Sequence, residues 1–137
     1  MKSRFFHGAV FVAFLSCITA IAAAPPPAAP FNGHNATQAF QMNRSGGIQQ
    51  VVAKDPNDKQ LVAAIRAYLE AEAQRFGNGD YSGHFKGVRN LKAVKPGQIA
   101  ITYRNVPAGA AIDYVGADAV AVDAIHTWLD AEIPDQE

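Results

Sequence analysis

The chain has 137 residues, of which 49% are hydrophobic, and its 12 basic residues balance its 12 acidic residues. This length suits one domain, and the apolar content excludes an intrinsically disordered chain. Zero net charge argues against a nucleic-acid binder, which needs excess positive charge to displace the counterions of the phosphate backbone. The sequence also lacks a P-loop, a dinucleotide fingerprint, a Cys-rich zinc motif and a G-x-S-x-G elbow.

Residues 1–22 predict a signal peptide. A short basic start precedes an apolar run that closes with small residues at 20–24. This layout is typical of a secretory signal, and the small residues favour cleavage over an uncleaved membrane anchor. We therefore expect a secreted or periplasmic protein that does not associate with the membrane after cleavage. Cleavage also removes Cys17, the only cysteine, so the exported domain would fold without a disulfide.

Residues 23–36 are rich in Pro and Ala and predict a flexible segment, after which residues 37–137 form a single domain. Alternating apolar residues on both sides of the turn 43–47 predict a first hairpin between residues 37 and 53. A helix is expected from Pro56 to Phe76, with Asp55 as its N-cap and Pro56 in its first position. Its apolar stripe has Glu72 on the flank.

Residues 77–96 indicate an irregular loop with a short helix near 90–94. Alternation at 99–104 and again at 110–114 predicts a second hairpin, in which we expect Tyr103 and Tyr114 to pair across the strands. A last helix begins after Asp118 and buries Trp128.

The element order is therefore ββαββα. Amphipathic helices and half-buried strands bury their apolar faces together in a two-layer sandwich. We predict an α+β fold in which a mainly antiparallel four-stranded sheet carries two helices on one face.

Functional groups concentrate on loops held by rigid scaffolds, so the irregular loop from Gly77 to Pro96 is the expected binding site. Because no set of nucleophile, base and acid can be assembled, the sequence favours a non-catalytic module that binds a small ligand or a protein. The basic run at 86–104 precedes an acidic C-terminal segment, and the sequence favours mutual neutralisation of the two over a basic face for an anionic ligand. The candidate binding residues are Asp80, His84, Lys86, Arg89, His126 and Asp135.

The alternative is a divalent-metal protein, or a small enzyme that uses His84 and His126 with a carboxylate from Asp80 or Asp135. Two imidazoles and a carboxylate suit zinc, which requires the two rings to lie within about 8 Å of each other. The competing interpretation is that both histidines are ordinary polar residues, one on a loop and one on a helix flank.

The segments Gly79-Asp80-Tyr81, Gly83-His84 and Ala124-Ile125-His126-Thr127-Trp128 resemble a family of small secreted bacterial proteins of unknown function. That family has H-G followed by M-P-G-L in its loop and A-I-H-x-W-F-D-A-Q, then D-H-G, at its end. This chain lacks the M-P-G, and Gln136 replaces the last histidine. Some members are labelled aspartate carbamoyltransferase, but this chain has one small domain and no Ser-Thr-Arg-Thr phosphate-binding turn. The resemblance implies export and fold rather than a reaction.

Overall fold

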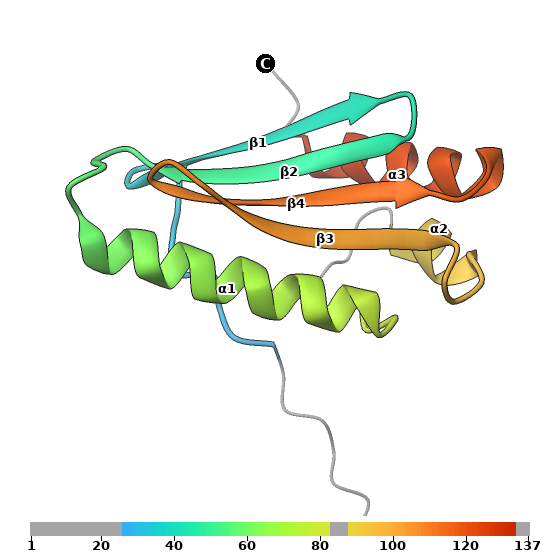
Figure 1. Ribbon diagram of the computed structural model, residues 1–137, viewed down its shortest axis with the longest axis horizontal. Coiled ribbons are helices and arrows are strands. Elements are labelled where there is room, and N and C mark those ends of the chain that lie inside the picture. Colours follow the sequence, from blue (N-terminus) through green and yellow to red (C-terminus); the bar gives the residue numbers. More distant parts are fainter. Residues whose placement is uncertain (1–25, 83–87, 134–137) are drawn as a thin grey trace, which may run out of the picture.

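The computed structural model describes residues 26–82 and 88–133, which form one α+β unit with the predicted ββαββα order (Figure 1). A short helix, predicted near 90–94, precedes the second hairpin. The elements are β1 (Ala36–Asn43), β2 (Gly46–Ala53), α1 (Lys59–Gly77), α2 (Val88–Ala93), β3 (Ile99–Val106), β4 (Gly109–Gly116) and α3 (Ala119–Glu132).

The four strands form one sheet in the order β1-β2-β4-β3, and every neighbouring pair is antiparallel. Phe76 of α1 and Trp128 of α3 both pack against Tyr114 of β4, so the two long helices cover the same face of the sheet. This arrangement confirms the predicted fold. No helix in the described part of the chain has the length and apolar content needed to cross a membrane.

The first hairpin has a tighter turn than the sequence predicts. Arg44 and Ser45 alone connect β1 to β2, and the Asn43 side chain accepts hydrogen bonds from the Ser45 backbone and hydroxyl at 3.0 Å. Gly46 then adopts a φ of +146°, and a Cβ atom there would lie 2.1 Å from the Tyr114 carbonyl oxygen. Only glycine allows β2 to approach β4 so closely at this position.

The start of α1 differs from the prediction. The N-cap is Asp58, whose carboxylate accepts the Leu61 N–H at 2.9 Å, and the helix begins at Lys59. Asp55 instead accepts the Asn57 N–H at 2.9 Å and forms a separate turn around Pro56. Both aspartates are suitable N-cap residues, but Asp55 lies in the turn that leads out of β2, so Asp58 caps the helix.

The second hairpin contains both predicted strands, but the predicted tyrosine pair is wrong. Tyr103 lies opposite Ile112, and Tyr114 lies opposite Ile101. The pairing is set by the two-residue turn at 107–108, which places the tyrosines two positions out of register. Asp118 caps α3 as predicted, because its carboxylate accepts the Ala121 N–H at 2.9 Å.

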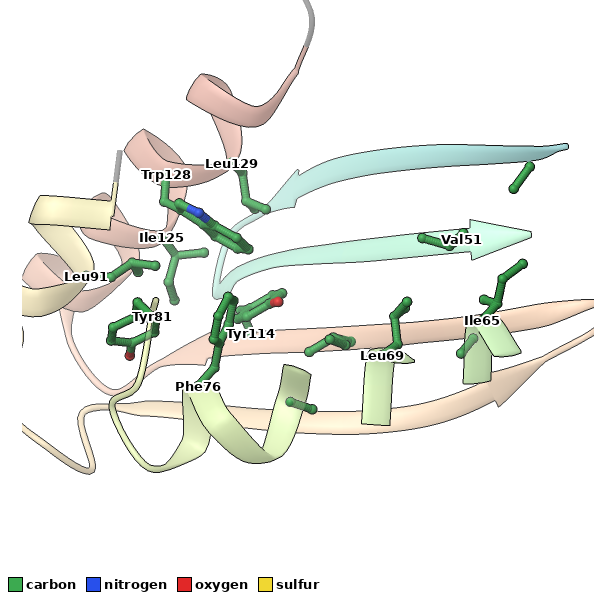
Figure 2. Close-up of a cluster of buried hydrophobic side chains, with 14 of the residues drawn as sticks. Val51, Ile65, Leu69, Phe76, Tyr81, Leu91, Tyr114, Ile125, Trp128 and Leu129 are labelled. Carbon is green, nitrogen blue, oxygen red and sulfur yellow. The ribbon is translucent and has the colours of Figure 1, made fainter. Parts of the chain in front are cut away.

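The core lies between the helices and the sheet and is richest in aromatic rings at one end (Figure 2). Trp128 is fully buried there, as predicted, with its ring centre 4.9 Å from Tyr114 and 5.7 Å from Phe76. Edge-to-face contacts of this kind add to the free energy gained by burying the rings. Ile65 and Leu69 of α1 continue the core toward the other end of the sheet.

Two polar side chains are buried within this apolar layer. Glu72 is only 1% exposed, so it belongs to the buried face of α1 and not to the flank as predicted. The Gln49 amide donates to the Glu72 carboxylate at 3.0 Å, and the Tyr114 hydroxyl donates to the Gln49 carbonyl oxygen at 2.8 Å. These hydrogen bonds compensate the cost of burying polar groups.

We predict that Ile65→Ala and Trp128→Ala each lower the free energy of unfolding by about 2–5 kcal/mol, because both side chains are fully buried and their removal leaves a cavity. Urea unfolding followed by circular dichroism measures the change. Val120→Ala, at a 73% exposed position, is the control. A change below about 0.5 kcal/mol in either core variant would be typical of a surface site and would contradict the assigned core.

We predict that stability falls steeply as the pH rises above about 10, the ordinary pKa of tyrosine. Burial raises the pKa of Tyr114 well above this value, so the folded protein keeps a proton that the unfolded chain loses. Tyr114→Phe should flatten this fall and cost about 1–3 kcal/mol at neutral pH, because Gln49 loses its donor. Urea unfolding between pH 8 and 11 tests this. An equally steep fall in Tyr114→Phe would contradict it.

Candidate functional site

The C-terminal end of α1 forms one wall of the site. The chain leaves the helix at Asn78 and Gly79, whose backbone N–H groups donate back to the last carbonyls of α1. Gly79 has a φ of +77°, a conformation that glycine adopts without strain. The turn directs Tyr81 back onto the core, where its ring centre lies 5.0 Å from Phe76.

A cavity of about 250 Å³ opens beside this turn, between α1, α2 and the start of β3. Part of its apolar lining comes from buried core residues, among them Phe76, Tyr81 and Leu91, whose side chains are drawn in Figure 2. The apolar lining residues are Phe76, Tyr81, Leu91, Val94, Pro96 and Ile99. This volume suits a compact apolar group, which would displace water from a preformed wall.

Lys92 and Lys95 contribute the charged part of the lining. Both are exposed, and no carboxylate among the described residues lies within 4 Å of either ammonium group. Lys92 is on α2, and Lys95 begins the turn in which the Gln98 N–H donates to the Lys95 carbonyl. The cavity therefore combines apolar walls with two lysines at its rim, of which Lys92 also interacts electrostatically with the Asp80 carboxylate.

A second, more open cavity of about 620 Å³ continues from the first along β3. Gly77 and Asn78 line both cavities, so the two lie side by side between α1 and the β3 edge of the sheet. We call the two cavities together the α1–β3 groove. Its remaining lining residues are Glu70, Ala73, Gln74, Ile101 and Tyr103.

The far end of the α1–β3 groove carries both charge signs. Burial raises the pKa of Tyr103, the nearby Glu70 carboxylate raises it further, and Arg66 opposes them. The Arg66 guanidinium is already engaged, because it donates to the Val106 and Gly109 carbonyls at 3.1 and 3.0 Å. Glu70 is exposed and lines the groove. Among the residues that line the groove, the two lysines thus lie at one end and the Glu70 carboxylate lies at the other.

The structure places two predicted loop residues near this groove but not in its lining. Asp80 lies between Gly79 and Tyr81, and hydrogen bonds from the Ser82 side chain and backbone lower the pKa of its carboxyl. This contact makes Asp80 a turn residue. Arg89 is exposed on α2. Lys92 and Lys95, which line the cavity, were not among the candidate residues. The only feature of the sequence that pointed to them was their place in the basic run at 86–104.

His126 lies on α3, beside the turn of the first hairpin. Its Nε2 atom is 2.8 Å from the Asn43 carbonyl oxygen. Because a carbonyl oxygen only accepts, Nε2 carries the proton and donates, which fixes the hairpin to the helix. The ring therefore has a structural contact in this arrangement.

His84, Lys86 and Asp135 fall outside the described residues, so the predicted approach of His84 to His126 stays a prediction. Within residues 26–82 and 88–133, no cluster of three or more His, Cys, Asp or Glu side chains could hold a metal ion.

Comparison with protein-family models, with curated proteins and with solved structures finds no match for this chain. The resemblance to small secreted bacterial proteins therefore stays a prediction from its motifs.

Proposed function

We propose that this protein is an exported, non-catalytic binding module that takes an anionic ligand with an apolar body in the α1–β3 groove. The observation that supports it is the cavity in which Lys92 and Lys95 stand at the rim of apolar walls. Ligand sites are typically apolar cavities with a few charged groups that orient the bound molecule. Lysine ammonium groups supply charge-assisted hydrogen bonds to an anion.

The proposed site lies mostly in the segment between α1 and β3, and connecting segments held by a rigid scaffold are common places for binding residues. Residues 77–81 and 91–99 supply most of the cavity lining, at the end of the core that holds the aromatic cluster. The buried rings of Phe76 and Tyr81 give the cavity a rigid base. A loop supported in this way can bind without large rearrangement.

We predict that the anionic, aromatic dye 8-anilinonaphthalene-1-sulfonate binds the native protein with one dye per chain. The double variant Lys92→Gln/Lys95→Gln should weaken binding about tenfold or more, because the sulfonate loses its cationic partners. Fluorescence titration measures the dissociation constant, and circular dichroism confirms folding.

The matched control is Arg44→Gln/Lys59→Gln, which removes the same charge from exposed residues at the first hairpin turn and the start of α1. The control should bind the dye as the unmodified protein does. Equal losses in the two double variants would mean that net charge decides binding, and an unchanged affinity in Lys92→Gln/Lys95→Gln would exclude this site.

A further inference from the structure

The outer edge of β3 is an unpaired strand edge along the α1–β3 groove. In an antiparallel pair, alternate residues exchange backbone hydrogen bonds with the neighbouring strand. The Ala117 N–H donates to the Gln98 carbonyl, and this hydrogen bond continues the pairing of β3 with β4. Because alternate residues form these bonds, the even-numbered residues of β3 are the ones hydrogen-bonded to β4. Ile99, Ile101 and Tyr103 therefore direct their N–H and C=O groups away from the sheet, and no described backbone group pairs with them.

The same three residues line the groove, Ile99 in the first cavity and Ile101 and Tyr103 in the second. Their side chains lie on the helix-covered face, and α1 forms the opposite wall. A free strand edge beside a helix can accept an extended peptide as an additional strand, with alternate peptide side chains in the groove.

Charge sets the direction of such a peptide. Lys92 and Lys95 stand at the Ile99 end, whereas Glu70 lies at the Tyr103 end. A C-terminal carboxylate at the basic end makes the peptide run from Tyr103 toward Ile99, opposite to β3. This direction continues the antiparallel order of the whole sheet.

We infer that the α1–β3 groove binds an extended peptide that pairs antiparallel with β3 and places its C-terminal carboxylate beside Lys92 and Lys95. This inference rests on the proposed function and identifies its ligand class. The last peptide residue lies opposite Ile99 and fills the first cavity, and the fifth residue from the end lies opposite Tyr103, near Glu70.

The probe is the hexapeptide acetyl-TKVTVL with a free carboxylate. Its residues favour an extended strand, its last side chain is apolar, and its lysine is fifth from the end. The purified protein should bind this peptide about tenfold more tightly than the same peptide with a C-terminal amide, by isothermal titration calorimetry. Lys92→Gln/Lys95→Gln should remove this preference, whereas Arg44→Gln/Lys59→Gln should keep it.

Hydrogen exchange tests the strand pairing without any substitution. Bound peptide should slow exchange of the Ile101 and Tyr103 amides about tenfold or more, because they become hydrogen-bonded. The Phe40 amide is the internal control, since β1 forms the other edge of the sheet. Protection at Phe40 instead of β3, or protection of β3 before peptide is added, as in a dimer paired through β3, would contradict the inference.

A charge exchange tests the direction. Glu70→Lys should weaken binding of acetyl-TKVTVL and strengthen binding of acetyl-TEVTVL. Equal effects on both peptides would exclude the antiparallel placement. If the dye binds but neither the free acid nor the amide does, the peptide inference is wrong and the proposed function stands. If dye and peptide both fail to bind, both are wrong.

Discussion

The position of α1 depends on the buried hydrogen bonds that join Glu72, Gln49 and Tyr114. A buried carboxylate and a buried amide are tolerated only when their hydrogen-bonding groups find partners. The Gln49 side chain satisfies Glu72 on α1 and Tyr114 on β4 together, at 3.0 and 2.8 Å. A rotation of α1 that withdrew Glu72 would leave these groups without partners, so the hydrogen bonds fix which face of the helix meets the sheet.

This constraint extends to the groove. Arg75 lies one turn beyond Glu72, with its Nη2 atom 4.0 Å from the Glu72 carboxylate, and it donates to the Ser82 carbonyl at 3.1 Å. Phe76 follows at once and packs on Tyr114. The residues that hold the helix therefore also hold the turn that leaves it, and the separation of α1 from β3 follows from both.

The two faces of the sheet are built for different surroundings. The face away from the helices carries an ion pair between Arg104 and Asp113, with 2.7 Å between the Nε and Oδ2 atoms. The helix-covered face carries the apolar core, and at its β3 margin the core reaches the groove through Ile99 and Ile101. Ile99 and Ile101 pack against the core but are only partly buried, so a ligand in the groove can contact their side chains.

Local patterns predicted the elements because capping and alternation act over a few residues. Asp118 and the alternation around Ile101 are examples, whereas Asp55 and Asp58 show that two equally suitable caps need the tertiary path to decide between them. The burial of Glu72 required Gln49, which is 23 residues away. The second cavity could not be predicted for the same reason, since Glu70 and Tyr103 come together only in the folded chain.

A crystal structure of the protein with bound acetyl-TKVTVL tests whether the groove binds a peptide as an added strand. We expect a fifth strand beside β3, hydrogen-bonded to the backbone of Ile101 and Tyr103, with its carboxylate within hydrogen-bond distance of the Lys92 or Lys95 ammonium. A peptide bound along β1, or on the face that carries Arg104 and Asp113, would contradict it.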